Sequence, residues 1–126
     1  MKNTIQISDA EWEIMKVLWQ SPGLTAVEVH EQLADSTEWH AKTVRTMLGR
    51  LQKKKVVEAT VVDNLYRFRP LYSKDACVGA ASTSFLSRVF DGSLSPMLTH
   101  FVRGSQMSKK DRAELERILN KYHQEK

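Results

Sequence analysis

The stretch from residue 40 to residue 55 constrains this chain more than any other part of its sequence. Four apolar residues recur there at positions i, i+3, i+4 and i+7, namely Val44, Met47, Leu48 and Leu51. This spacing predicts an amphipathic helix over about 41–54 with one buried face. The other side of the helix carries basic and small polar residues, and no acidic residue occurs in the whole stretch. An ordinary exposed helix gains stability from mixed charges four residues apart, so the reason for excluding acids lies outside the chain.

A β-hairpin is expected directly after this helix. Two β-prone runs, 56–62 and 65–69, are separated by Asp63-Asn64, a pair that favours a tight turn. In the second run aromatic and basic residues alternate, which places the rings on one face of the strand and the guanidinium groups on the other.

Two further helices are expected before residue 40. Ser8 and Glu11 have the spacing of a capping box, and apolar residues recur at helical intervals after them. Thr25 and Glu28 repeat this spacing at the start of a shorter helix, to which Val27 is expected to contribute an apolar position. The residue before that cap, Leu24, is placed to form either a short pairing strand or a hydrophobic staple.

This order of elements predicts a winged helix-turn-helix over residues 1–72, in a chain that is mainly α with a small β-hairpin wing. In such folds the helix at 41–54 enters the major groove of DNA and the wing lies near the backbone. Lys, Arg and Thr side chains are the groups that contact phosphates and base edges. On the polar side of the helix and on the wing the candidates are Lys42, Arg45, Thr46, Arg50, Lys53, Arg67 and Arg69.

The net charge of +4 is unevenly distributed along the chain. Residues 1–39 carry −5, residues 40–69 carry +6 and residues 70–126 carry +3. A basic block inside a folded segment indicates a local surface for a polyanion. Charge alone would also fit a solvated lysine-rich face, so the inference depends on the placement of these bases on one acid-free helix.

Residues 73–126 are expected to form a helical dimerisation domain. Helical spacing predicts a helix over about 74–90, a short one opened by Ser95-Pro96, and a last one capped by Ser108. So few residues cannot close a useful core alone, and a second copy is the simplest partner. The apolar residues expected at this interface are Phe85, Leu86, Val89, Leu98, Phe101, Val102, Leu115, Ile118, Leu119 and Tyr122.

Composition argues against several other classes of protein. No stretch approaches the ~18 consecutive apolar residues of a membrane helix, and the first residues lack the apolar core of a secretory signal, so a cytoplasmic protein without membrane insertion is expected. Cys77 is the only cysteine, the histidines are scattered, and no HExxH, CxxC or glycine-rich phosphate loop occurs. No enzyme activity, metal or cofactor is therefore expected.

Two alternatives to a simple DNA-binding protein are open at this point. The winged-helix fold also serves as a protein-interaction module, although such a module has no need to exclude acids from one helix. The other alternative keeps the DNA binding and adds a small-molecule pocket in the C-terminal half.

Three motifs resemble the penicillinase-repressor family (BlaI, MecI and CopY) in the right order and spacing. They are the run from Ile7 to Trp19, the series Trp39-x-x-Lys42-Thr43-Val44-x-Thr46-x-Leu48-x-Arg50-Leu51-x-Lys53-Lys54, and Tyr66-x-Phe68-x-Pro70-Leu71. The resemblance covers nearly the whole chain. It implies a homodimer that binds a palindromic operator and blocks transcription. The residues at the family's DNA-contacting positions are Lys42, Thr43, Arg45, Thr46 and Arg50, and Trp39 lies in the same motif.

The resemblance also implies a signal that relieves repression. In the family a membrane sensor-protease that detects a β-lactam commonly leads to cleavage in the dimerisation region, at a position that corresponds to His100-Phe101. This chain departs from β-lactam-responsive members, which have Asn-Phe at that position, and from copper-responsive members, which end in Cys-x-Cys pairs. Both departures leave the inducing signal open.

A third departure concerns the end of the basic helix. Lys55 occupies a position at which the family usually has glycine. Lysine there must either adopt the left-handed backbone conformation or belong to a different cap.

Overall fold

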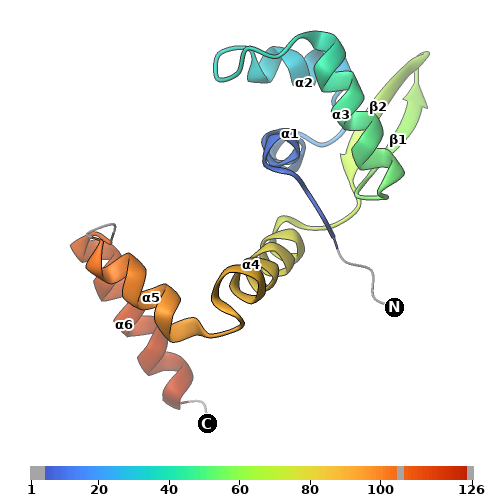
Figure 1. Cartoon of the computed structure of the whole chain (residues 1–126). Coiled ribbons are helices and arrows are strands. Elements are labelled where there is room, and N and C mark those ends of the chain that lie inside the picture. The colour runs from blue at the N-terminus through green and yellow to red at the C-terminus, as the bar shows by residue number, and fades with distance from the viewer. Residues whose placement is uncertain (1–4, 105–106, 125–126) are drawn as a thin grey trace. The chain divides into compact units, whose positions relative to one another are not determined.

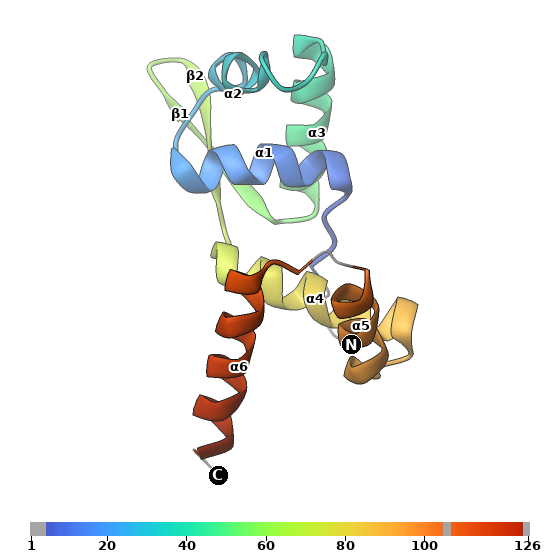
Figure 2. The same ribbon diagram turned by 90° about the vertical axis from the view of Figure 1, so that its left-hand side faces the viewer.

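The computed structural model describes residues 5–104 and 107–124, and it confirms a mainly helical chain with one two-stranded antiparallel hairpin (Figures 1 and 2). Residues 1–4, which belong to the segment inspected for a secretory signal, lie outside the described residues. The elements are α1 (Asp9–Gln20), α2 (Ala26–Leu33), α3 (Ala41–Lys53), β1 (Val57–Val62), β2 (Leu65–Pro70), α4 (Lys74–Phe90), α5 (Leu94–Arg103) and α6 (Lys109–Gln124). Two compact units divide the chain, Met1–Ser82 and Thr83–Lys126.

Capping boxes start both α1 and α2, as predicted. The Ser8 hydroxyl accepts a hydrogen bond from the backbone N–H of Glu11 at 3.2 Å, and the Glu11 carboxylate accepts one from the backbone N–H of Ser8 at 3.0 Å. Thr25 and Glu28 make the same reciprocal pair, at 3.2 and 2.9 Å. Each box satisfies backbone donors that a helix start leaves open, which explains why both helices begin where they do.

The core of the first unit lies between α1, α2, α3 and the hairpin. Its fully buried members include Ile14 and Leu18 of α1, Val29 of α2 and Leu48 of α3. The prediction for Val27 was wrong: its side chain is 55 % exposed. The short α2 buries only Val29 and Leu33, because eight residues make little more than two turns and offer one narrow face to the core.

The hairpin turns on Asp63 and Asn64, as the sequence predicts. Both residues have positive φ, 54° and 67°, which is the conformation of the tight turn that suits the twist of a hairpin. The structure also decides the role of Leu24, which forms a bridge with Phe68 of β2 rather than serving only as a staple. The backbone N–H of Phe68 donates to the carbonyl of Leu24 at 2.9 Å, so the base of the wing is fixed to the segment that starts α2.

Lys55 ends the basic helix in the left-handed conformation, with φ 65°. The N–H of Lys55 donates to the carbonyl of Gln52, and the N–H of Val56 donates to that of Leu51. These two bonds are the pair that defines a Schellman cap. Val56 and Leu51 are both buried, and their burial offsets the cost, about 1–2 kcal/mol, of placing a non-glycine residue there.

The second unit holds the end of α4 together with α5 and α6. The Ser108 hydroxyl accepts from the backbone N–H of Asp111 at 3.0 Å, as expected for a cap of α6. α5 begins at Leu94, after the N-cap Ser93, so Pro96 lies inside its first turn rather than at its first position. None of the described helices is long and apolar enough to cross a membrane.

Candidate nucleic-acid interface

Helix α3 presents one buried face to the core and one exposed face to solvent. Val44, Leu48 and Leu51 are fully buried. The polar residues predicted to contact DNA lie on the exposed part of the helix, and these are Lys42, Thr43, Arg45, Thr46, Arg50 and Lys53. Within the described part of the chain, none of the four bases in that set has an ion-pair partner. The exposed face of α3 is therefore a cluster of uncompensated positive charges.

The start of α3 differs from the starts of α1 and α2. Its N-cap, His40, makes no side-chain capping hydrogen bond, and its first turn has no acidic residue. The other two helices each place a glutamate there. The backbone N–H groups and the positive end of the helix dipole are thus left uncompensated at the same end as Lys42.

Two small residues shape the exposed face. The Thr46 hydroxyl donates to the backbone carbonyl of Lys42 at 3.0 Å, so its proton is used within the helix while its oxygen still accepts. Gly49 has open space where a Cβ would stand: apart from its chain neighbours and the backbone of its own helix, no described atom lies within 4 Å. Packing inside the protein therefore does not require a glycine at this position.

Trp39 lies just before α3 and is partly buried against the core of the first unit. Its backbone carbonyl is 2.9 Å from Nε2 of His30 in α2, which ties the segment between the two helices to α2. The structure thus places Trp39 where it supports the start of α3, and a direct contact of its ring with DNA stays a prediction.

The wing separates its two arginines. Arg69 is exposed, whereas Arg67 is half-buried. The Arg67 guanidinium donates to the carbonyl of Gly23 at 3.0 Å and lies 3.5 Å from the carboxylate of Glu28. The alternation expected for the strand holds at Phe68, which is buried, while Tyr66 extends beyond the core and is 63 % exposed.

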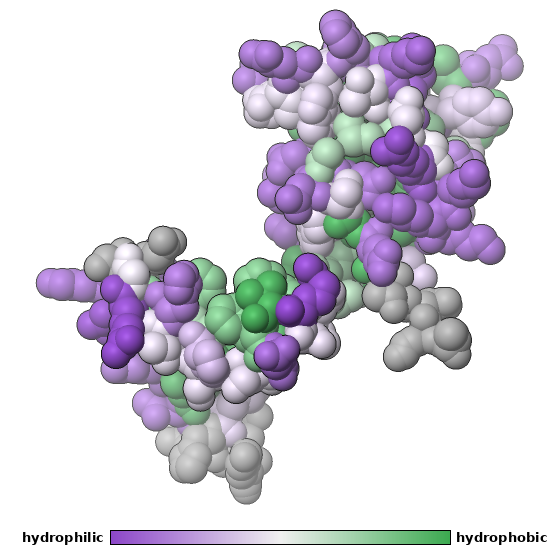
Figure 3. All heavy atoms as spheres, viewed as in Figure 1, coloured by the Kyte–Doolittle hydropathy of each residue, from purple (hydrophilic) through white to green (hydrophobic). Residues whose placement is uncertain are grey.

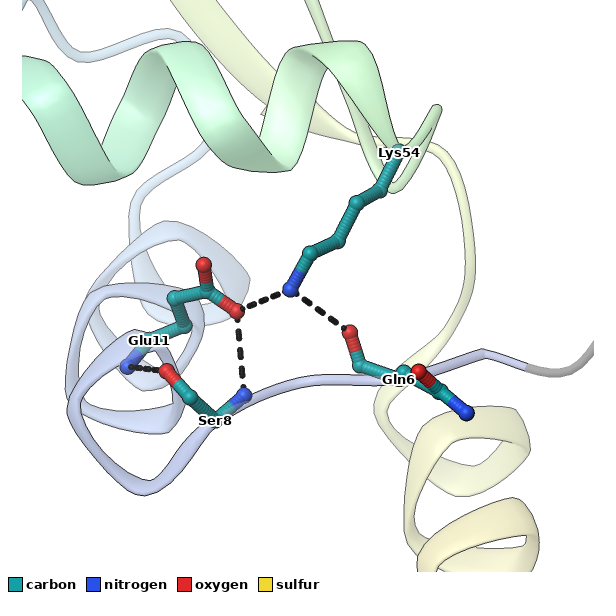
Figure 4. Close-up of polar contacts among 4 residues, drawn as sticks. All are labelled: Gln6, Ser8, Glu11 and Lys54. Atoms are coloured by element: carbon teal, nitrogen blue, oxygen red, sulfur yellow. Dashed lines mark hydrogen bonds and ion pairs between the residues drawn. The ribbon is translucent and has the colours of Figure 1, made fainter.

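A buried carboxylate holds the other end of α3, and no sequence pattern indicated this contact. Glu11 is 2 % exposed, and its Oε1 accepts a hydrogen bond from Nζ of Lys54 at 2.6 Å (Figure 4). The same ammonium donates to the carbonyl of Gln6 at 3.1 Å. Burial alone would raise the pKa of Glu11, but the hydrogen bonds from Lys54 and Ser8 outweigh it and hold this pKa below its ordinary value.

This pKa predicts how stability depends on pH. A carboxyl group with a lowered pKa in the folded state stabilises the fold above its unfolded pKa, about 4.3, and this contribution is lost as the pH falls through the folded pKa. Glu11→Gln is therefore expected to be less stable than the parent at pH 7, with the difference shrinking below about pH 4.3. Urea unfolding at several pH values measures this, and an undiminished difference at low pH would contradict the role of the charge.

In the second unit, the apolar residues predicted for dimerisation remain accessible. No residue between 83 and 122, among those described, is buried. Phe85, Val89, Ile118, Leu119 and Tyr122 are between 39 % and 57 % exposed. Leu86, Leu98 and Leu115 are partly covered, and Phe101 and Val102 are exposed. These side chains leave a large apolar surface that a single copy does not bury.

His100 and Phe101, the residues at the predicted cleavage position, lie within α5. Both are exposed, and their rings are 5.6 Å apart in an edge-on arrangement. A hollow of about 690 Å³ lies beside His100, lined by Phe90 and by residues along α5 from Ser95 to Arg103. Within residues 5–104 and 107–122, no group of histidine, cysteine or carboxylate side chains is arranged to hold a metal ion.

Comparison with known proteins bears directly on this interface. The family model described as "Penicillinase repressor" matches residues 7–121. The chain belongs to the penicillinase repressor family. This is a family of transcriptional repressors rather than enzymes. The match includes α1, α2, α3 and the wing, and it confirms the resemblance drawn from the three sequence motifs.

Full-length relatives agree with the family match. The penicillinase repressor of Bacillus licheniformis is 34% identical over 126 residues, which are 100% of this chain and 98% of the relative. The methicillin resistance regulatory protein MecI of Mammaliicoccus sciuri is 29% identical over 118 residues, 94% of this chain and 96% of its own.

Solved structures are similar to parts or nearly all of this chain. The DNA-binding domain of the repressor BlaI matches with a TM-score of 0.52 and 36% identity, over 59% of this chain and 90% of that one. The B. licheniformis BlaI monomer in complex with the blaP half-operator matches with a TM-score of 0.51 and 36% identity, over 60% and 92%. MepR, a Staphylococcus aureus transcription regulator, is 19% identical with a TM-score of 0.50 over 95% and 80%, and this likeness concerns the fold alone.

Proposed function

We propose that this family member is a homodimeric transcriptional repressor that binds palindromic operator DNA through α3, with the β1–β2 wing beside the phosphate backbone. The observation that carries the proposal is the exposed face of α3, where four bases stand together and, among the described residues, none forms an ion pair. Repulsion between these like charges destabilises the free protein, and a bound polyanion offsets this repulsion.

The open start of α3 and the position of Gly49 support the same proposal. An uncapped helix start with an adjacent lysine attracts phosphate groups. A glycine inside a helix costs about 1 kcal/mol relative to alanine, and here no neighbour within the described chain requires it. Close approach of a duplex to this face supplies a reason. The BlaI relative that was solved with a half-operator covers this part of the fold.

Within this proposal residues 1–72 bind DNA and residues 73–126 form the dimer. The exposed apolar side chains of α5 and α6 and the C-terminal end of α4 support a second copy as the partner. Figure 3 shows apolar residues gathered on the surface over α4. Because the two half-sites of a palindrome repeat the same sequence, a two-fold dimer places one α3 on each.

We also propose that repression is relieved by cleavage in the dimerisation region, at His100-Phe101, with a membrane sensor-protease as the partner. The family membership and the exposure of both side chains on α5 support this site. Loss of the dimer would then weaken operator binding, because each separate protomer would bind only one half-site.

The proposed function is tested by the salt dependence of DNA binding. We expect the purified protein to bind a duplex selected from a random pool. The logarithm of its association constant, log K, should fall linearly with the logarithm of the salt concentration, because each neutralised phosphate contributes about −0.9 to the slope. Arg50→Ala is expected to weaken binding by about 1–3 kcal/mol if it contacts a base, while the fold survives. Fluorescence anisotropy at several salt concentrations measures both.

Arg112→Ala is the matched control, because it removes the same charge from an exposed position on α6. It should leave operator affinity unchanged. Binding that does not depend on salt, or no attraction to duplex DNA even at low ionic strength, would overturn the proposed function.

A further inference from the structure

Two bases of the segment 40–69 pair with glutamates of the protein, although their side chains remain 38 % and 33 % exposed. Lys54 donates to the carboxylate of Glu11 at 2.6 Å, and Arg67 lies 3.5 Å from the carboxylate of Glu28. Both glutamates are the ones that close the capping boxes of α1 and α2. In each case the same oxygen, Oε1, accepts from the N-cap backbone and faces the base.

We propose that Lys54 and Arg67 are positioning residues: Lys54 fixes the C-terminal end of α3 against α1, Arg67 fixes the wing against the start of α2, and neither contacts phosphate. This inference rests on the proposed function, because it says which bases of the DNA-binding unit are left to neutralise the duplex. It divides the bases of this segment into those that contact DNA and those that fix the positions of α3 and the wing.

The contact at Lys54 is built to restrain α3. Lys54 is the C-cap residue of the helix, and its ammonium joins the start of α1 and the carbonyl of Gln6 to that end (Figure 4). The Glu11 side chain is 3 % exposed, and its carboxylate is already oriented by the hydrogen bond that it accepts from the backbone N–H of Ser8. A base that reaches a preorganised, buried carboxylate gives up that bond only at a high cost, so Lys54 is not available to a phosphate.

The contact at Arg67 restrains the wing through a backbone carbonyl together with a carboxylate that is 43 % exposed. Its guanidinium bonds the carbonyl of Gly23, and Gly23 also donates its N–H to the carbonyl of Phe68 at 2.8 Å. The bridge between Leu24 and Phe68 continues this attachment. Arg67 thus ties β2 to the residues immediately before α2, while its neighbour Arg69 remains exposed. The direction in which the wing leaves the core is set by these contacts.

The salt slope separates the two classes of base. Lys54→Met and Arg67→Met are compared with Lys53→Met and Arg69→Met, which remove the same charge one or two residues away. We expect Lys53→Met and Arg69→Met to reduce the slope of log K against log salt by about 0.9 each. Lys54→Met and Arg67→Met should leave the slope unchanged. They should instead lower the preference for the selected duplex over random duplex by about tenfold, because a misplaced helix or wing loses contacts with base edges.

The preference between two duplexes is measured at a temperature at which circular dichroism shows each variant to be folded. A loss of stability alone therefore does not explain a lower preference. Lys54→Arg and Arg67→Lys should recover part of the preference. Glu11→Gln keeps the capping acceptor and tests the same contact if Lys54→Met does not fold. A slope reduced by about 0.9 in Lys54→Met or Arg67→Met, or an unchanged preference, would overturn the inference. If the parent protein shows no salt-dependent DNA binding, the proposed function itself is wrong.

Discussion

Replacing Ile118 by aspartate is expected to convert the protein into a monomer and to lower its affinity for a palindromic operator by about 10²–10⁴-fold. Ile118 is 39 % exposed on α6, beside Leu119 and Tyr122, which are 55 % and 57 % exposed. A carboxylate in the middle of this apolar surface would be buried without a partner in the dimer, and that burial is costly. The proposed dimer would gain its affinity by engaging two half-sites at once, so its loss should remove most of the binding to the full operator.

Sedimentation and anisotropy measure the two halves of this prediction on the same sample. A duplex that contains one half-site should bind one protomer of the parent and one protomer of the variant with the same affinity, because α3 and the wing are unchanged. Asn120→Asp is the matched control, since it adds the same charge at an exposed position on the opposite side of α6. A variant at Ile118 that stays dimeric would show that the dimer interface lies elsewhere.

Local signals explain why much of the first unit could be predicted from sequence. The capping boxes at Ser8 and Thr25 act over three residues, and the apolar spacing of α3 fixes which of its faces is buried. Lys55 shows how far such local reasoning extends: the sequence left a left-handed residue or a different cap open, and φ of 65° decides for the first. Backbone geometry at a helix end depends on a few neighbouring residues, so sequence suffices there.

The roles of individual bases could not be predicted in the same way. Lys53, Lys54 and Lys55 are consecutive lysines, yet the structure leaves the first on α3, pairs the second with Glu11 and uses the third to end the helix. Glu11 is 43 residues away from Lys54, and no periodicity connects positions so distant. The pairing of Arg67 with the start of α2 likewise depends on the Leu24–Phe68 bridge. Tertiary contacts, rather than residue type, decide which charges are free.

The second largest expected effect concerns stability. Leu48 is fully buried at the centre of α3, in the core that this helix shares with α1 and α2. Leu48→Ala is expected to lower the free energy of unfolding of the first unit by about 2–5 kcal/mol, because it leaves a cavity in close-packed surroundings. Leu48→Met, which nearly conserves the volume, should cost less than about 1.5 kcal/mol. Urea unfolding followed by tryptophan fluorescence measures both.

The adjacent residue should respond with the opposite sign. Gly49 lies on the exposed face of α3, has an ordinary helical backbone, and leaves room for a Cβ. Gly49→Ala is therefore expected to raise the free energy of unfolding by about 0.5–1 kcal/mol, because alanine loses less backbone entropy in a helix. The added methyl group stands on the surface proposed to meet the duplex, so operator affinity should fall in the same variant. A protein that is both more stable and bound equally tightly would show that this turn of α3 does not approach DNA closely, whereas a destabilised one would contradict its exposed position.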